Sequence, residues 1–117
     1  MSNAAAIQDY FHRQYVTMEG NIEENIYAMF DENVRYTRAD GNTVSIETII
    51  QTVTSVHQTP ENERVVKVTD FREEGNGVAF HMFLQFRRPD SGELVVSESD
   101  PIWYFNDEGK VIQAKQQ

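Results

Sequence analysis

The fold is decided by Val78-Ala-Phe-His-Met-Phe-Leu-Gln-Phe-Arg-Arg88 and by the segments that follow it: Pro89-Asp-Ser-Gly92, Glu93-Leu-Val-Val-Ser-Glu-Ser-Asp-Pro-Ile-Trp-Tyr-Phe105, Asn106-Asp-Glu-Gly109 and Lys110-Val-Ile-Gln-Ala-Lys115. Apolar side chains recur at every second position of the first segment, and the opposite face is mixed. The two glycine-ending tetrapeptides are typical of tight turns. The stretch therefore predicts three antiparallel strands with one apolar face that needs a cover.

Helices upstream supply that cover. Residues 4–19 predict a helix because apolar residues recur at helical spacing until Gly20-Asn21 ends it. A short second helix follows, with acidic residues in its first turn. A third helix is expected to begin after Ser45, a good N-cap, and to end at Thr59-Pro60.

Two further strands complete the pattern. Asn33-Val-Arg-Tyr-Thr-Arg38 alternates β-branched and aromatic residues with polar ones. Residues 63–74 form another candidate strand, in which Val66 and Val68 are expected to face opposite Val65 and Phe71, and Gly75-Asn-Gly77 is a hairpin turn. The predicted order is helix, helix, strand, helix, then four meandering strands in a single domain spanning 1–117.

Composition narrows the function classes. The chain has 19 acidic and 10 basic residues, a net charge of −9, and no cysteine. This charge disfavours nucleic-acid binding, and no apolar run or leader pattern predicts a membrane segment, so a cytoplasmic location is the default expectation. No phosphate-binding glycine loop, nucleophile elbow or zinc spacing is present, so neither a cofactor nor a metal is predicted.

The chain resembles the nuclear transport factor 2-like superfamily, which includes ketosteroid isomerases and SnoaL-like polyketide cyclases. The resemblance rests on the order and spacing of four segments: Tyr10-Phe-His-Arg-Gln-Tyr15, Glu19-Gly-Asn-Ile-Glu-Glu-Asn-Ile-Tyr-Ala-Met-Phe-Asp31, Val34-Arg-Tyr-Thr-Arg-Ala-Asp-Gly41 and Trp103-Tyr-Phe-Asn-Asp-Glu-Gly-Lys-Val111. It implies an α+β fold in which a cone-shaped, curved antiparallel sheet is covered by three N-terminal helices. It also implies a pocket inside the cone and a homodimer formed through the outer sheet face, where Phe83 and Gln85 lie.

Only some of the catalytic positions of ketosteroid isomerases have a matching residue in this sequence. Those enzymes use an aspartate base with a tyrosine and a protonated aspartic acid. Tyr15 falls at the tyrosine position, but Thr37 or Arg38 falls at the base position. The protonated acid falls near Pro101, one residue from Asp100. Asp100 and Tyr15 are therefore the catalytic candidates, with an exposed strand position beside Glu98 as the alternative for Asp100.

Further candidates would line the pocket under the same geometry. Arg38 would anchor an acidic group, or alternatively pair with Asp40 at the strand end. The other expected ligand-binding residues are Tyr36, Trp103, Met18, Phe86 and His57. Each also fits an ordinary core position or, for His57, a helix C-terminus.

Three function classes remain open. The chain is expected to bind a small apolar or weakly acidic ligand, either as a SnoaL-like cyclase or isomerase using acid–base chemistry or as a non-catalytic binding domain. The alternative is a dimerisation or protein-association module with a filled cone. An open cone would bring Tyr15, Tyr36, Arg38, Asp100 and Trp103 to one cavity.

Overall fold

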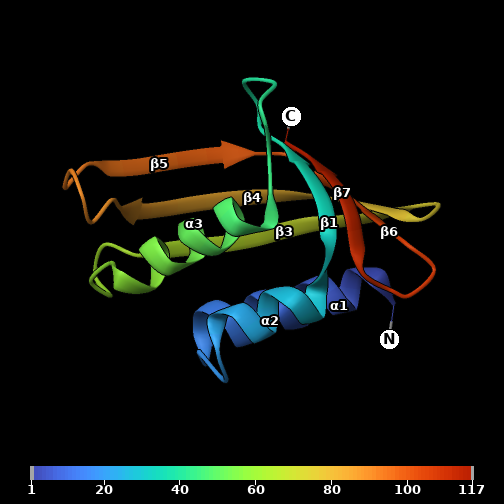
Figure 1. Cartoon of the computed structure of the whole chain (residues 1–117), viewed down its shortest axis with the longest axis horizontal. Helices are drawn as coiled ribbons and strands as arrows, with labels where there is room; N and C mark the ends of the chain where they lie inside the picture. Colours follow the sequence, from blue (N-terminus) through green and yellow to red (C-terminus); the bar gives the residue numbers. More distant parts are fainter. Residues whose placement is uncertain (1, 117) are drawn as a thin grey trace.

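The computed structural model describes residues 2–116, which fold into helices on one side of a curled sheet (Figure 1). The helical elements are α1 (Asn3–Phe11), the π-helical turn η1 (His12–Val16), α2 (Ile22–Met29) and α3 (Ile46–Gln58). The strands are β1 (Phe30–Thr37), β2 (Thr43–Val44), β3 (Val65–Glu74), β4 (Gly77–Arg87), β5 (Leu94–Ser99), β6 (Ile102–Phe105) and β7 (Val111–Lys115). The predicted α+β fold with three covering helices is confirmed.

Side-chain caps start the first two helices. The Ser2 hydroxyl accepts a hydrogen bond from the Ala5 N–H, and the Asn21 side chain accepts from the N–H groups of Glu23 and Glu24. These bonds satisfy N–H groups that the helix itself leaves without partners. The prediction of one α-helix over 4–19 is wrong beyond Phe11, because the chain widens there into the π-helical turn.

The sheet is mixed rather than purely antiparallel. Its strand order is β2-β1-β7-β6-β4-β3, and β5 also pairs with β4. All pairings are antiparallel except β1 with β7, which run parallel. The long strand β4 pairs with β6 near its start and with β5 along its second half. β4 therefore connects β5 and β6 to the sheet and also pairs with β3 along most of its length.

The expected single strand over 93–105 is divided at Asp100-Pro101. Proline has no N–H to donate to the ladder, so regular pairing stops there. Ser99 still pairs with Met82, and Ile102 pairs with Ala79, while the Pro101 carbonyl accepts from the Phe80 N–H at 3.1 Å. The break interrupts the pairing but leaves the alternation of side chains intact, since Ser99, Pro101 and Trp103 are buried and Asp100 is exposed.

A bulge in β3 also changes a predicted face. Asp70 has a φ of 59°, and between Thr69 and Arg72 the strand has one more residue than β4 opposite it. The extra residue turns Phe71 inward, where its ring stacks on Phe80 at 5.2 Å. The expectation that Phe71 faces away from Val66 and Val68 is therefore wrong, since all three pack against the core.

The core lies between the helices and the inner sheet face. Its central members are Ile7, Ile26, Phe30, Val78, Phe80, Trp103 and Val111. Inner-facing residues of β4 match the alternation read from the sequence, since Phe80, Met82 and Phe86 are all buried. Among residues 2–116, no helix is long and apolar enough to cross a membrane.

Candidate functional site

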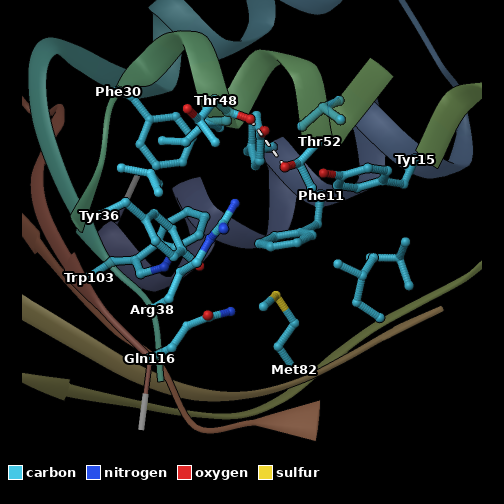
Figure 2. A pocket seen from close by; sticks show the side chains of 16 residues that line it. Phe11, Tyr15, Phe30, Tyr36, Arg38, Thr48, Thr52, Met82, Trp103 and Gln116 are labelled. Atoms are coloured by element: carbon cyan, nitrogen blue, oxygen red, sulfur yellow. Dashed lines mark hydrogen bonds between the residues drawn. The ribbon is translucent and has the colours of Figure 1, made fainter. Parts of the chain in front are cut away.

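A cavity of about 120 Å³ lies between the inner sheet face and the helices (Figure 2). Its wall combines residues from α1, η1, β1, β2, α3, β3, β4 and β6 with Arg38, which follows β1, and Gln116, which follows β7. The lining residues are Tyr10, Phe11, Tyr15, Phe30, Tyr36, Arg38, Val44, Thr48, Ile49, Thr52, Val53, Val66, Met82, Leu84, Trp103 and Gln116. The cone is therefore not completely filled by its own side chains.

The π-helical turn brings two side chains inward at the helical end. Gln14 is fully buried, and its amide donates to the Tyr10 hydroxyl and to the Ile22 carbonyl, each at 3.4 Å. Its oxygen accepts from the Asn25 amide at 3.3 Å. Because η1 is wider than an α-helix, Tyr15 next to Gln14 also reaches the cavity.

Aromatic rings form most of the remaining wall. The Trp103 indole lies 5.0 Å from Phe30, 5.2 Å from Phe80 and 5.6 Å from Phe11, measured between ring centroids. These contacts are tilted, edge-to-face or stacked, which are the favourable arrangements of aromatic pairs. Packing of this kind on several sides fixes the indole in one orientation.

One end of the cavity is polar. Figure 2 shows Tyr36, Arg38, Trp103 and Gln116 close together, with Tyr15 at the opposite end. Trp103 is only 2% exposed, yet its indole N–H makes no hydrogen bond of good geometry within residues 2–116. Buried polar groups normally have partners, and an unpartnered donor costs about 1–3 kcal/mol. This N–H is therefore available to an acceptor inside the cavity.

Arg38 stands at the same end of the cavity. It makes no ion pair with the part of the chain that the structure describes. The alternative pairing with Asp40 is not formed, because that carboxylate accepts from the Asn42 backbone and amide at 2.9 and 3.1 Å. The Arg38 backbone N–H donates to the Asn42 carbonyl at 2.8 Å, and this bond fixes the backbone from which the side chain extends.

Burial keeps the cavity tyrosines neutral. It raises the pKa of Tyr10 and of Tyr36 to about 12, and it raises the pKa of Tyr15 well above its ordinary value. Trp103, Arg38 and Gln116 counteract part of the rise in the pKa of Tyr36. Of residues 2–116, no Asp, Glu or His lines the cavity. The site therefore offers hydrogen-bond donors and one cation, but no base that is ionised near neutrality.

Four of the five residues expected to converge do so: Tyr15, Tyr36, Arg38 and Trp103. Asp100 does not, and its predicted position in the pocket is wrong. Ser99 points inward and is buried, so the next side chain along the strand points outward, where Asp100 is 65% exposed. Its carboxylate accepts from His81 Nδ1 at 2.8 Å on the outer face of the sheet, beside Glu98.

Three other expected ligand-binding residues also lie outside the cavity lining. Met18 sits in the turn after η1 with a φ of 52°. Phe86 is buried farther along β4, beyond the cavity. His57 Nε2 donates to the Gln14 carbonyl at 2.7 Å, and its ring lies behind Tyr15 at 6.0 Å. Burial lowers the pKa of His57, so it supports η1 as a neutral side chain.

Several lining residues were not identified from the sequence. Thr48 and Thr52 are one helical turn apart on the inner stripe of α3, so their spacing beside Ile49 and Val53 was an available signal. Gln116 carries no such pattern. Its backbone N–H donates to the Thr37 carbonyl at 2.8 Å, which continues the β1–β7 pairing and places its side chain at the cavity.

Comparison with known proteins gives matches in structure only. No model of a known protein family matches the chain, and no curated protein matches it in sequence. A candidate SnoaL-like polyketide cyclase from Jannaschia sp. CCS1 is 18% identical, with a TM-score of 0.71 over 98% of this chain and 83% of that one. An uncharacterised cystatin-fold protein from Novosphingobium aromaticivorans is 12% identical, with a TM-score of 0.75 over 100% and 98%.

A third similar solved structure contains a bound small molecule. A protein with a ketosteroid isomerase-like fold from Catenulispora acidiphila DSM 44928, solved in complex with trimethylamine, is 13% identical, with a TM-score of 0.64 over 96% of this chain and 83% of that one. At such low identities these similarities concern architecture. Together with the curled sheet and its three covering helices, they show that the chain has the fold of the nuclear transport factor 2-like superfamily.

Proposed function

We propose that the cavity binds a small molecule with an apolar body and a hydrogen-bond-accepting, carboxylate-type head. The observation that carries this proposal is the buried indole N–H of Trp103, which has no acceptor of good geometry within residues 2–116 and lies beside the Tyr36 hydroxyl. Arg38 stands at the same end of the cavity and makes no ion pair with the described residues. A carboxylate would accept from these donors together, and hydrogen bonds that involve a charged group are the stronger kind.

The rest of the wall suits an apolar body. Phe11, Phe30 and Met82 present carbon and sulfur atoms to the cavity, and Ile49 and Val53 close it from α3. Ligand sites commonly combine such a wall with a few convergent polar groups that fix orientation. The polar groups here gather at one end, so the ligand would enter with a single orientation.

Binding is better supported than acid–base catalysis. The three cavity tyrosines can donate hydrogen bonds, but their raised pKa values make them weak acids, and the described lining contains no carboxylate to act as a base. Asp100, the sequence-based candidate for that role, lies on the opposite face of the sheet. The alternative of a filled cone is less well supported, because space remains beside the unpartnered indole.

The test is a fluorescence titration. Trp103 is the single tryptophan, so benzoate bound beside it would change the only indole emission of the protein. Arg38→Gln should weaken benzoate binding by about 10-fold to 100-fold, since a hydrogen bond to a charged group contributes about 1.5–3 kcal/mol. Arg72→Gln removes the same charge from an exposed site on β3 and should leave binding unchanged.

Two results would overturn the proposal. One is a Trp103 emission that no apolar acid changes at millimolar concentration. The other is benzoate binding that Arg38→Gln and Arg72→Gln weaken equally, because the cation would then contribute only to the general field of the protein.

A further inference from the structure

The cavity is small, and its size limits the ligand. Its volume is about 120 Å³. An apolar cavity of about 150 Å³ holds benzene, whereas pockets for drug-sized molecules span about 300–1,000 Å³. A body of several fused rings therefore exceeds the space between the sheet and the helices.

The walls of the cavity cannot easily widen. Trp103 packs against Phe30, Phe80 and Phe11 at centroid distances of 5.0, 5.2 and 5.6 Å, and both Phe30 and Phe80 are almost completely buried. Tyr10 adds edge contacts to Phe11 and Phe30. Moving any one of these rings would disturb several others, and close-packed interiors resist such changes.

The cavity continues outward through a polar passage. A neighbouring groove of about 500 Å³ runs between α3 and strands β4 and β5. The same five residues line both spaces: Arg38, Thr48, Thr52, Leu84 and Gln116. Beyond this passage the groove has hydroxyl and amide groups from Gln51, Ser55 and Ser97, so the outlet is polar while the inner end is aromatic.

We infer that the ligand is a single-ring carboxylate, with its ring in the cavity and its carboxylate in the passage at Arg38. Any further substituent beyond the carboxylate end extends into the groove, and bodies of two or more fused rings are excluded. This inference rests on the proposed function and adds the size class of the ligand. Its charge follows from Arg38, which has no ion pair within residues 2–116.

The experiment is a size series followed by Trp103 fluorescence. Benzoate, 2-naphthoate and a four-ring steroid carboxylic acid carry the same head on bodies of increasing size. The expected order is benzoate first, with 2-naphthoate at least about tenfold weaker because overpacking a filled apolar site is unfavourable, and no saturable binding of the steroid acid.

Two variants test which side chains restrict the size of the ligand. Leu84→Ala removes a side chain that borders both the cavity and the passage, so it should reduce the preference for benzoate over 2-naphthoate. Val95→Ala shortens a side chain that borders the groove alone, and it should keep the wild-type preference. An unchanged preference in Leu84→Ala would overturn the assignment of the size limit to the walls of the cavity.

The remaining outcomes separate this inference from the function it rests on. Equal or tighter binding of 2-naphthoate or the steroid acid to the wild-type protein would overturn the single-ring limit and leave the proposed binding function intact. Failure of all three acids to change Trp103 emission at millimolar concentration would overturn the proposed function and the inference with it.

Discussion

At the scale of single residues, Ser99 and Asp100 show how a difference of one position along a strand decides whether a side chain is buried or exposed. Both are small polar residues in the same strand-like segment, yet Ser99 is buried and Asp100 is exposed. Successive side chains on a strand point to opposite faces, so a shift of one residue exchanges pocket and solvent. Asp100 consequently meets His81 instead of the cavity tyrosines.

The first prediction concerns this pair. The carboxylate of Asp100 raises the pKa of His81, with a smaller contribution from Glu98. Asp100→Asn should therefore lower the pKa of His81 in an NMR titration of its ring protons, because the amide cannot stabilise the imidazolium by charge. Asp107→Asn, in an exposed turn, is the matched control and should leave the His81 pKa in place.

The sign of the linked stability effect follows from the direction of the shift. Because the folded pKa of His81 is raised above its unfolded value, its contribution to stability is complete below about pH 6.5. That contribution is lost as pH rises through the folded pKa. Asp100→Asn should therefore flatten the pH dependence of unfolding in this window, and an unchanged His81 pKa in the variant would refute the pairing.

The residues of the cavity differ in how far sequence could identify them. Tyr36 and Trp103 lie on strands whose alternation shows their faces, and both line the cavity. Tyr15 and Arg38 line it as well, but Tyr15 lies in the π-helical turn and Arg38 follows the end of β1. Asp100 could face the cavity only if Pro101 shifted the register by one residue. The proline interrupts the strand pairing but leaves the alternation intact, since Ser99, Pro101 and Trp103 are buried and Asp100 is exposed. Gln116 follows the last strand, and no periodic pattern includes it. Its position depends on a backbone bond to Thr37 that only the folded chain reveals.

At the scale of elements, the unpredicted features are local irregularities. The sequence indicated the helices and most strand positions through hydrophobic period and turn residues. It did not indicate the π-helical turn at His12–Val16 or the bulge at Asp70, because each adds one residue to an otherwise regular element. Tertiary packing decides where such an insertion occurs. Both insertions nevertheless matter, since they turn Tyr15 and Phe71 inward.

The second prediction tests the assigned faces of β4 and α3. Phe86 is 5% exposed on the inner face of β4, so Phe86→Ala should lower the free energy of unfolding by about 3–5 kcal/mol in a denaturant titration. Ile50→Ala should cost less, because Ile50 is half-buried at the edge of the α3 stripe, whereas its neighbour Ile49 is buried. A loss below about 0.5 kcal/mol for Phe86→Ala would contradict the face assignment.

At the scale of the whole molecule, the helices leave the outer sheet face uncovered (Figure 1). Val95 and Ser97 border the groove against α3, so Leu94 and Val96 project to the outer side, where they are 43% and 57% exposed. Phe83 lies on the same face of the neighbouring strand β4. We propose that this apolar patch of Phe83, Leu94 and Val96 pairs with the same patch of a second copy.

The third prediction follows from that patch. The wild-type protein should sediment as a dimer at micromolar concentration, and Val96→Lys should shift it to monomer by burying an unpaired charge between the copies. Val16→Lys is the control, since Val16 is 68% exposed on η1, away from the outer sheet face. A monomeric wild-type protein would contradict this proposal, as would dissociation by Val16→Lys but not by Val96→Lys.

The central claim, that the cavity binds a carboxylate through Trp103 and Arg38, is tested most directly by the ¹H–¹⁵N NMR signal of the indole. One tryptophan gives one indole signal, and benzoate should move its proton downfield in a saturable manner as the carboxylate accepts this hydrogen bond. Toluene, which has the ring without the acceptor, should not reproduce that downfield shift. An indole signal that stays in place up to millimolar benzoate would contradict the account.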